Sequence, residues 1–178
     1  MRPRRAPLWP ALGLMVLIAL AVHAASLWAL PRLIMHKALQ TVGGPQPPAP
    51  VRPPLATQTA RAIVLPSPDL LYGVCVADLR RQDLAVQVDL RGLPYASVAI
   101  YDERSDNIWV MNDRQAIDAP VRLRLQGPDA PPAAKDAAQA VRVPGTRALV
   151  LVRFLVTDRQ DGLARAEAAR QSLRCQAL

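Results

Sequence analysis

The chain has 178 residues and a formal net charge of +8, from 22 Lys and Arg against 14 Asp and Glu. The charge is uneven: Met1 to Pro68 holds seven basic residues and no acid, whereas Asp69 to Leu178 holds all fourteen acids and is nearly neutral. A nucleic-acid-binding domain concentrates Lys and Arg on its folded part. The composition therefore argues against nucleic acid as a partner.

A long apolar run follows a basic segment over residues 1–7. The twenty residues from Ala11 to Leu30 carry no formal charge, and as a helix they cover about 30 Å, the thickness of a bilayer's hydrocarbon core. Trp9 and Trp28 stand where interfacial aromatic residues are expected, and the arginines before the run mark its cytoplasmic end. We predict a single-pass transmembrane anchor over residues 8–31 in the bacterial inner membrane, with a cytoplasmic N-terminus and a periplasmic C-terminal domain.

A cleaved signal peptide is the alternative for this segment. Val22, His23 and Ala24 place small residues around a cleavage point, after an apolar region of suitable length. The apolar run nevertheless continues past Ala24 to Leu30 and on to Ile34. We therefore predict that the anchor is not cleaved.

Residues 32–62 are predicted to be a linker. Six prolines stand between positions 45 and 54, and proline favours an extended polyproline II spacer because it donates no backbone hydrogen bond. This segment is expected to hold a domain away from the bilayer.

The remaining part, residues 63–178, is predicted to be an extracytoplasmic β-rich domain. "DLAVQVDL" (83–90) and "VRLRL" (121–125) alternate apolar and polar residues as half-buried strands do, and turn-forming residues separate such runs. "ALVLVRFLV" (148–156) is apolar on both faces apart from Arg153, which is typical of a central strand.

The end of the chain has helical composition over residues 161–174, after Thr157 and Gln160 at capping-box spacing. Together with about seven short strands, this predicts a mainly β fold: an antiparallel β-sandwich or open barrel with a C-terminal helix.

The stretch "SDNIWVMNDR" is predicted to form the turn and return strand of a hairpin, and it gathers the polar residues Asp106, Asn107, Asn112, Asp113 and Arg114. Two interpretations stay open. Turn chemistry, a pairing of Asp113 with Arg114, or Asn112 bonding a neighbouring loop would make the cluster structural. Alternatively, these residues form the rim of a ligand-binding site.

The two cysteines, Cys75 and Cys175, are candidates for a disulfide, because an extracytoplasmic domain lies where disulfides persist. A bridge would close a loop of about a hundred residues and stabilise the fold by up to roughly 4–5 kcal/mol. The alternative is a buried free thiol at Cys75 and a frayed terminus at Cys175.

Several catalytic chemistries are excluded by composition. The only histidines, His23 and His36, lie in or beside the apolar segment, which leaves none for a nucleophile–histidine or zinc site in the folded domain. We predict no metal and no cofactor. Carboxylate chemistry remains, with the candidates Asp102, Glu103, Asp106 and Asp113.

Two motifs, "SPDLLYGVCVADL" (67–79) and "SDNIWVMNDRQA" (105–116), resemble the bacterial family catalogued as domain of unknown function twelve-fifty-four. The resemblance covers Pro66 to Cys175, and the chain departs from the family's usual tyrosine-aspartate pair by having Ala77-Asp78. It implies a β-rich fold, an N-terminal membrane anchor as in short members, and a companion domain that a separate anchored chain is expected to supply.

The resemblance implies no activity. We expect a non-catalytic binding or assembly module of the cell envelope, and the alternative is a carboxylate-dependent hydrolase acting on an envelope substrate.

Overall fold

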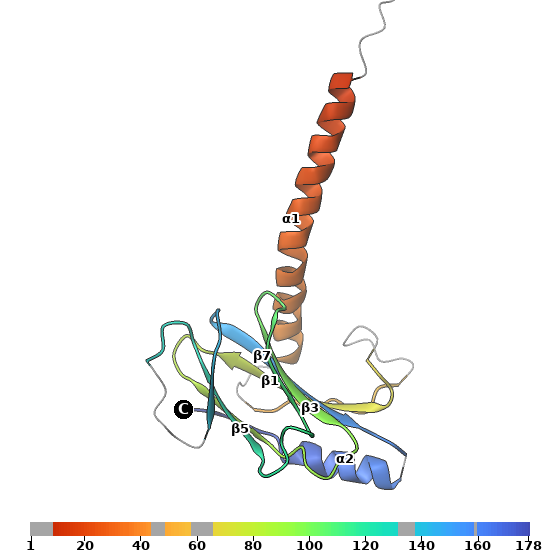
Figure 1. The fold of residues 1–178 in the computed structure, drawn as a ribbon, viewed down its shortest axis with the longest axis vertical. Coiled ribbons are helices and arrows are strands. Elements are labelled where there is room, and N and C mark those ends of the chain that lie inside the picture. Colours follow the sequence, from red (N-terminus) through yellow and green to blue (C-terminus); the bar gives the residue numbers. More distant parts are fainter. Residues whose placement is uncertain (1–8, 44–48, 58–65, 132–137, 159) are drawn as a thin grey trace, which may run out of the picture.

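The computed structural model describes residues 9–43, 49–57, 66–131, 138–158 and 160–178. The predicted basic segment, residues 1–7, lies outside the described residues. In the described part, two four-stranded sheets pack face to face and a long helix rises from one of them (Figure 1).

The first sheet has the order β1-β7-β3-β4 and the second the order β6-β5-β2-β8. Neighbouring strands run antiparallel, except for the parallel pair β5 and β6. The strands are β1 (Leu70–Asp78), β2 (Leu84–Val88), β3 (Ala96–Asp102), β4 (Asn107–Asn112), β5 (Val121–Gln126), β6 (Gln139–Arg142), β7 (Arg147–Leu155) and β8 (Arg174–Ala177). The predicted sandwich with a C-terminal helix is confirmed.

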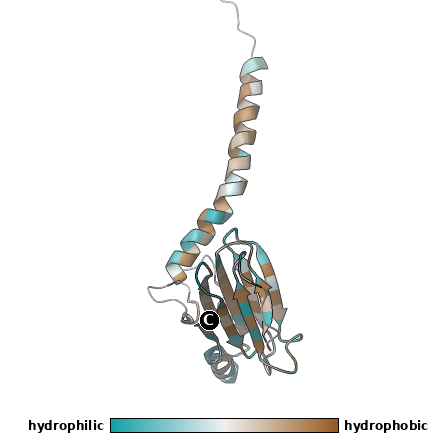
Figure 2. Ribbon diagram, turned by 90° about the vertical axis from the view of Figure 1, so that its left-hand side faces the viewer, coloured by the Kyte–Doolittle hydropathy of each residue, from teal (hydrophilic) through white to brown (hydrophobic). Residues whose placement is uncertain are grey.

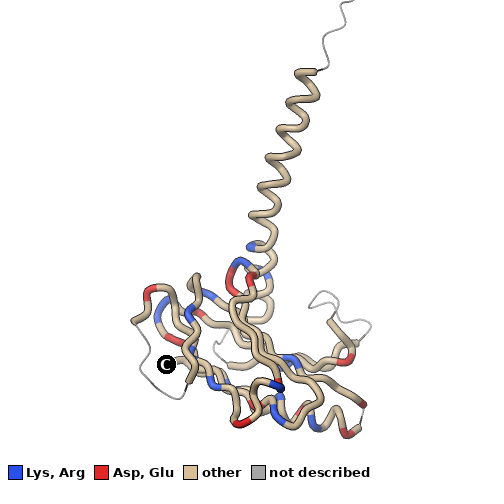
Figure 3. The backbone as a smooth tube through the Cα atoms, viewed as in Figure 1, with Lys and Arg blue, Asp and Glu red and all other residues tan. Residues whose placement is uncertain are grey.

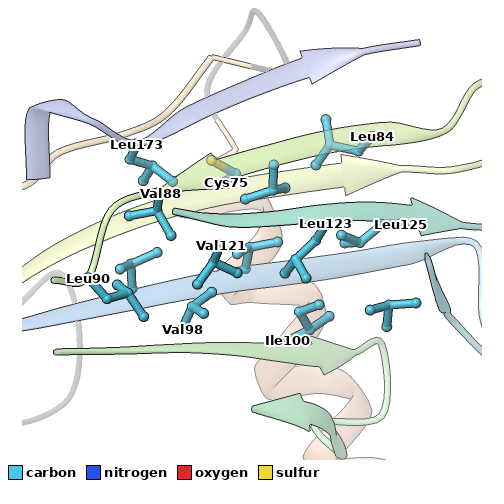
Figure 4. Close-up of a cluster of buried hydrophobic side chains, with 14 of the residues drawn as sticks. Cys75, Leu84, Val88, Leu90, Val98, Ile100, Val121, Leu123, Leu125 and Leu173 are labelled. Atoms are coloured by element: carbon cyan, nitrogen blue, oxygen red, sulfur yellow. The ribbon is translucent and has the colours of Figure 1, made fainter. Parts of the chain in front are cut away.

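The core lies between the two sheets, because alternate residues of each strand point inward. Val98 and Ile100 of β3 face Leu123 and Leu125 of β5 across it, as Figure 4 shows. Strand β7 lies between β1 and β3, which confirms the prediction of a central strand.

A disulfide joins the two sheets at one edge. Cys75 in β1 and Cys175 in β8 are bonded, with their Cα atoms 6.4 Å apart. Cys175 lies opposite Val86 of β2, so it belongs to a paired strand rather than to a frayed terminus.

Helix α2 (Asp161–Gln171) is shorter than the predicted 161–174. The chain turns at Leu173, which is fully buried, and continues as β8, because these residues pair with β2. The predicted capping box is not formed: the helix start is held by Asp158, whose carboxylate accepts N–H bonds from Gln160 and Gly162, both at 3.0 Å.

We expect the Asp158 contact to make folding stability pH-dependent. The backbone N–H of Gly162, and then that of Gln160, lower the pKa of the Asp158 carboxyl from its ordinary 3.8. A depressed folded pKa gives stability that is present above the unfolded value and is lost as the pH falls through the folded one. Urea midpoints measured from pH 6 to about 2.5 should fall in acid by less in Asp158→Asn than in the wild type. The exposed Asp118→Asn should keep the wild-type profile, and identical profiles for all three proteins would contradict the assignment.

Helix α1 (Trp9–Val42) is the one helix in the described part that is long and apolar enough to cross a membrane, by length and composition. None of its most apolar stretch is buried. It continues through Pro31 to Val42, so the first eleven residues of the predicted linker are helical. Proline leaves one carbonyl without its usual donor and bends a helix, and Figure 2 shows the axis turning beside the sandwich.

The lower end of α1 packs on the outer face of the first sheet. Met35 and Leu39 are buried against Val74, Val76 and Leu149. The outer face of β1 and β7 is therefore covered, which explains why these strands are apolar on both faces.

The proline-rich stretch also contacts the domain where it is described. Val51 exchanges two backbone hydrogen bonds with Val74 of the edge strand β1, at 2.7 and 2.8 Å. Arg52 donates to the carbonyls of Arg170 and Leu173. Residues 49–57 thus pack against the edge of the sandwich instead of forming an extended spacer, and residues 44–48 and 58–62 of the predicted linker lie outside the described residues.

Candidate functional site

The structure divides the predicted polar cluster into two groups. Asp106 and Asn107 lie at the start of β4, and Asn112, Asp113 and Arg114 lie at its end. A strand of this length separates the two groups by roughly 17 Å. The five residues therefore do not form one site.

The second group bonds the local backbone. The Asp113 carboxylate accepts from the Ala96 N–H at 3.1 Å, and the Asp113 N–H donates to the Ala96 carbonyl at 2.9 Å. The Asn112 side chain accepts from the Arg114 N–H at 3.1 Å. No hydrogen bond or ion pair joins the side chains of Asp113 and Arg114 among the described residues. This geometry favours the structural interpretation.

Asp113→Ala and Asn112→Ala are each expected to lower the free energy of unfolding by about 1 kcal/mol, because each removes a hydrogen bond to a backbone N–H. The shift in Tm would be a few degrees. Arg114→Ala is the control: its side chain is exposed, so Tm should stay unchanged. If all three variants melt like the wild type, the group has no structural role.

The first group belongs to a tight turn between β3 and β4. The fully buried Asp102 carboxylate accepts from the N–H groups of Arg104, at 2.7 Å, and Asp106, at 3.0 Å. It also accepts from Arg104 Nε at 3.2 Å. Ser105 has a φ of 70°, which is uncommon for a residue with a side chain. The Asp102 carboxylate thus holds a strained turn in one conformation.

That turn contacts helix α1. The Ser105 hydroxyl donates to the Pro31 carbonyl at 2.9 Å. The contact joins the hairpin to the bend of the helix, at the end of the apolar stretch.

A cleft of about 590 Å³ lies beside this contact. Three segments distant in sequence form its walls: the lower part of α1, the β3–β4 turn and the loop between β6 and β7. Its lining residues are Arg32, Leu33, His36, Leu39, Glu103, Arg104, Pro144, Gly145 and Arg147. Figure 3 shows charged residues gathering where α1 meets the sandwich, below a part of the helix that has none.

Some charged side chains of the cleft are paired with another residue and others are not. Arg104 is paired with Asp102 at 3.2 Å and lies 4.0 Å from Asp106. In contrast, the side chains of Glu103 and Arg147 make no hydrogen bond or ion pair with any described residue. These two groups of opposite charge line one cleft without contacting each other.

Arg32 and Arg147 line the cleft from different elements, α1 and β7. The Arg32 guanidinium lies 4.5 Å from the centre of the Trp28 ring and donates to the Trp28 carbonyl at 2.6 Å. Arg147 lies opposite Asp78 in the sheet. Asp78 is already paired with Arg80, whose hydrogen bonds lower the pKa of the Asp78 carboxyl. Both cleft arginines thus remain able to bind an anion.

Two smaller hollows have paired charges. In one, of about 360 Å³, Asp83 accepts from Arg124 and Gln126. In the other, of about 300 Å³, Asp89 is paired with Arg91 at 2.7 Å. The cleft at α1 is larger than both and is formed by three segments distant in sequence, so it is the better candidate for a binding site.

Sequence reasoning missed this cleft. His36, predicted to lie in the linker beside the apolar segment, lines it, and its Nε2 lies 2.9 Å from Gln40 Nε2. Arg32, just past the predicted anchor, also lines it. The sequence analysis did not predict that the helix continues past Pro31. This continuation places both side chains against the sandwich.

Comparison with one solved structure supports the fold. The VPA0106 protein from Vibrio parahaemolyticus aligns over 62% of this chain with a TM-score of 0.57 and 12% identity. A putative uncharacterized protein from Burkholderia cenocepacia aligns over 87% with a TM-score of 0.49 and 22% identity. This chain spans 28% of the first structure's length and 42% of the second's. A search of the curated proteins found no match.

The family model described as "Protein of unknown function (DUF1254)" matches residues 49–177. The match begins in the proline-rich stretch, at the residues that pack on β1, and it ends in β8. It covers more than half of the sequence, and the chain therefore belongs to the DUF1254 family.

Proposed function

We propose that this chain is a single-pass module of a bacterial inner membrane, with a cytoplasmic N-terminus and a periplasmic sandwich that acts by binding. The observation that carries the proposal is the continuity of α1. Its exposed apolar stretch passes without interruption into a segment docked on the sandwich. A membrane around that stretch would place the cleft at the membrane surface.

The spacing of two tryptophans supports this position. Trp9 and Trp28 are 82% and 65% exposed and are separated by nineteen residues of helix, or about 30 Å. That distance matches the hydrocarbon core, and tryptophan concentrates at its two boundaries.

The test uses the full chain in a Gram-negative host. We expect it to stay in the membrane pellet after alkaline carbonate extraction and to retain residues 1–30 in its intact mass. Protease should digest the sandwich in spheroplasts but not in intact cells. Release by carbonate, or an intact mass that begins after Ala24, would overturn the anchor; protection in spheroplasts would overturn the orientation.

Catalysis has less support. A hydrolase with two carboxylates needs both of them in one cleft, within about 10 Å. Glu103 is the one carboxylate among the described lining residues. Asp102 lies nearby, but it is fully buried and accepts three hydrogen bonds. Using it as an acid or base would break the turn.

A partner is part of the proposal: a separate anchored chain that carries the companion domain implied by the family resemblance. This chain spans 28% of the VPA0106 structure, so most of that structure lies outside the part that aligns with this chain. The strand β4 pairs only with β3 and forms an open edge in the described sheet, with Val110 56% exposed. Purification of the full chain in mild detergent from its native host should recover a second membrane protein in equal amount. Recovery of this chain alone would contradict the partner.

A further inference from the structure

The end of the cleft at Arg32 lies at the depth of the lipid headgroups, if α1 spans the membrane as proposed above. Arg32 follows Trp28 by four residues, or about 6 Å of helix. The polar layer on each side of a bilayer extends roughly 5–7 Å beyond the hydrocarbon core. Arg32 therefore reaches into the headgroup layer, and the cleft opens there.

The groups available in the cleft are two cations and one anion. Arg104 is already paired with the buried Asp102. Among the described residues Arg32 makes no ion pair with a carboxylate, and Arg147 is attracted only at longer range by Asp78, which is itself paired with Arg80. The carboxylate of Glu103 makes no hydrogen bond or ion pair within the described part of the chain. A ligand with only negative charge would bind the two arginines, but its charge would then lie beside the Glu103 carboxylate and repel it.

Gly145 makes room for Glu103 in the wall of the cleft. A Cβ added at Gly145 would lie 2.7 Å from the Glu103 carboxyl carbon, so the carboxylate rests against this backbone. A larger residue at position 145 would push the carboxylate aside.

We propose that the cleft binds the headgroup of a phospholipid with a primary amine, phosphatidylethanolamine. Its phosphate would accept hydrogen bonds from Arg32 and Arg147, because guanidinium groups match phosphate oxygens in geometry and charge. Its ammonium would donate to Glu103. The acyl chains would lie along the exposed apolar surface of α1 on the membrane side of Arg32, where Leu27 is 65% and Leu30 54% exposed. The phosphate and the ammonium of one headgroup would thus pair with the two arginines and with Glu103.

The experiment is native mass spectrometry of the full chain in detergent with short-chain lipids that share the same acyl groups. Phosphatidylethanolamine should bind about tenfold more tightly than phosphatidylcholine, which cannot donate to Glu103, because a hydrogen bond to a charged group is lost. It should also bind more tightly than phosphatidylglycerol, which has no ammonium. Equal binding of the three lipids would overturn the proposal.

The variants test the contacts to the phosphate and to the ammonium separately. Arg147→Gln should weaken all three lipids, whereas Glu103→Gln should remove only the preference for phosphatidylethanolamine. Gly145→Ala should also remove the preference for phosphatidylethanolamine, because the added methyl group displaces the Glu103 carboxylate. Arg114→Gln, at the far end of β4, is the matched control and should bind as the wild type does. Thermal unfolding of each variant shows whether the protein is still folded; a folded Glu103→Gln that keeps the preference contradicts the assignment.

Two further measurements distinguish a membrane lipid from a free headgroup and distinguish failure of the cleft assignment from failure of the membrane anchor. Free phosphoethanolamine should bind far more weakly than the lipid, and equal affinity would overturn the membrane source. Carbonate extraction is run on the same membranes. A chain that resists extraction but shows no lipid preference refutes only the cleft assignment, whereas a chain that is extracted refutes the anchor and with it the headgroup.

Discussion

Replacing both cysteines with alanine should lower the free energy of unfolding by about 4 kcal/mol, the largest change we expect from any variant. The disulfide between Cys75 and Cys175 closes a loop with a sequence separation of 100, and opening it gives the unfolded chain more conformations. For a domain of this size, Tm should fall by roughly 10–20 °C. Thermal unfolding of the full chain in detergent measures the shift.

Reduction provides the matched control for the cysteine variant. The wild type with a thiol reductant should melt near the temperature of the double variant, and the double variant should not respond to reductant. The wild type should also migrate faster on a non-reducing gel than on a reducing one. Equal mobility would show that the bond does not form in the protein.

Leu39→Ala should loosen the contact between α1 and the first sheet. Leu39 is 2% exposed, against Val76 and Leu149, and truncating a buried leucine costs about 2–5 kcal/mol in a protein core. We expect the lower end of that range, about 2 kcal/mol, because the contact lies at the margin of the fold. Amide hydrogen exchange of residues 33–42 in detergent should then become about 30-fold faster.

Leu27→Ala is the control for this experiment, since its side chain is 65% exposed in the apolar stretch of the same helix. It should leave the exchange of residues 33–42 unchanged. Exchange in Leu39→Ala that equals that of the wild type would mean that the helix does not depend on this packing.

The sequence predicted the strands where one physical signal dominated. Alternation identified β2 and β5, and an apolar run on both faces identified β7 as central. β8 was not predicted: the predicted helix ended at residue 174, and "RCQA" is too short for a period to be recognised. Only its pairing with β2, a contact distant in sequence, makes it a strand.

The candidate site was harder to predict, because its walls come from three distant segments. The anchor was predicted to end at residue 31, whereas the helix continues through Pro31 with a bend. The Ser105 hydroxyl bonds the Pro31 carbonyl there, a contact between distant segments that no local pattern reveals. The polar residues of β4 were grouped by sequence proximity, and a strand places its two ends far apart. A local pattern therefore located the hairpin but not the cleft.

The docking of α1 on the sandwich limits how far the domain can reach. In the proposed orientation the domain has no slack tether, so it moves with its helix and explores little space above the bilayer. A globular domain of about 120 residues is roughly 35 Å across. Any partner must therefore come within that height of the inner membrane, by lateral diffusion in the same membrane or through an extension of its own.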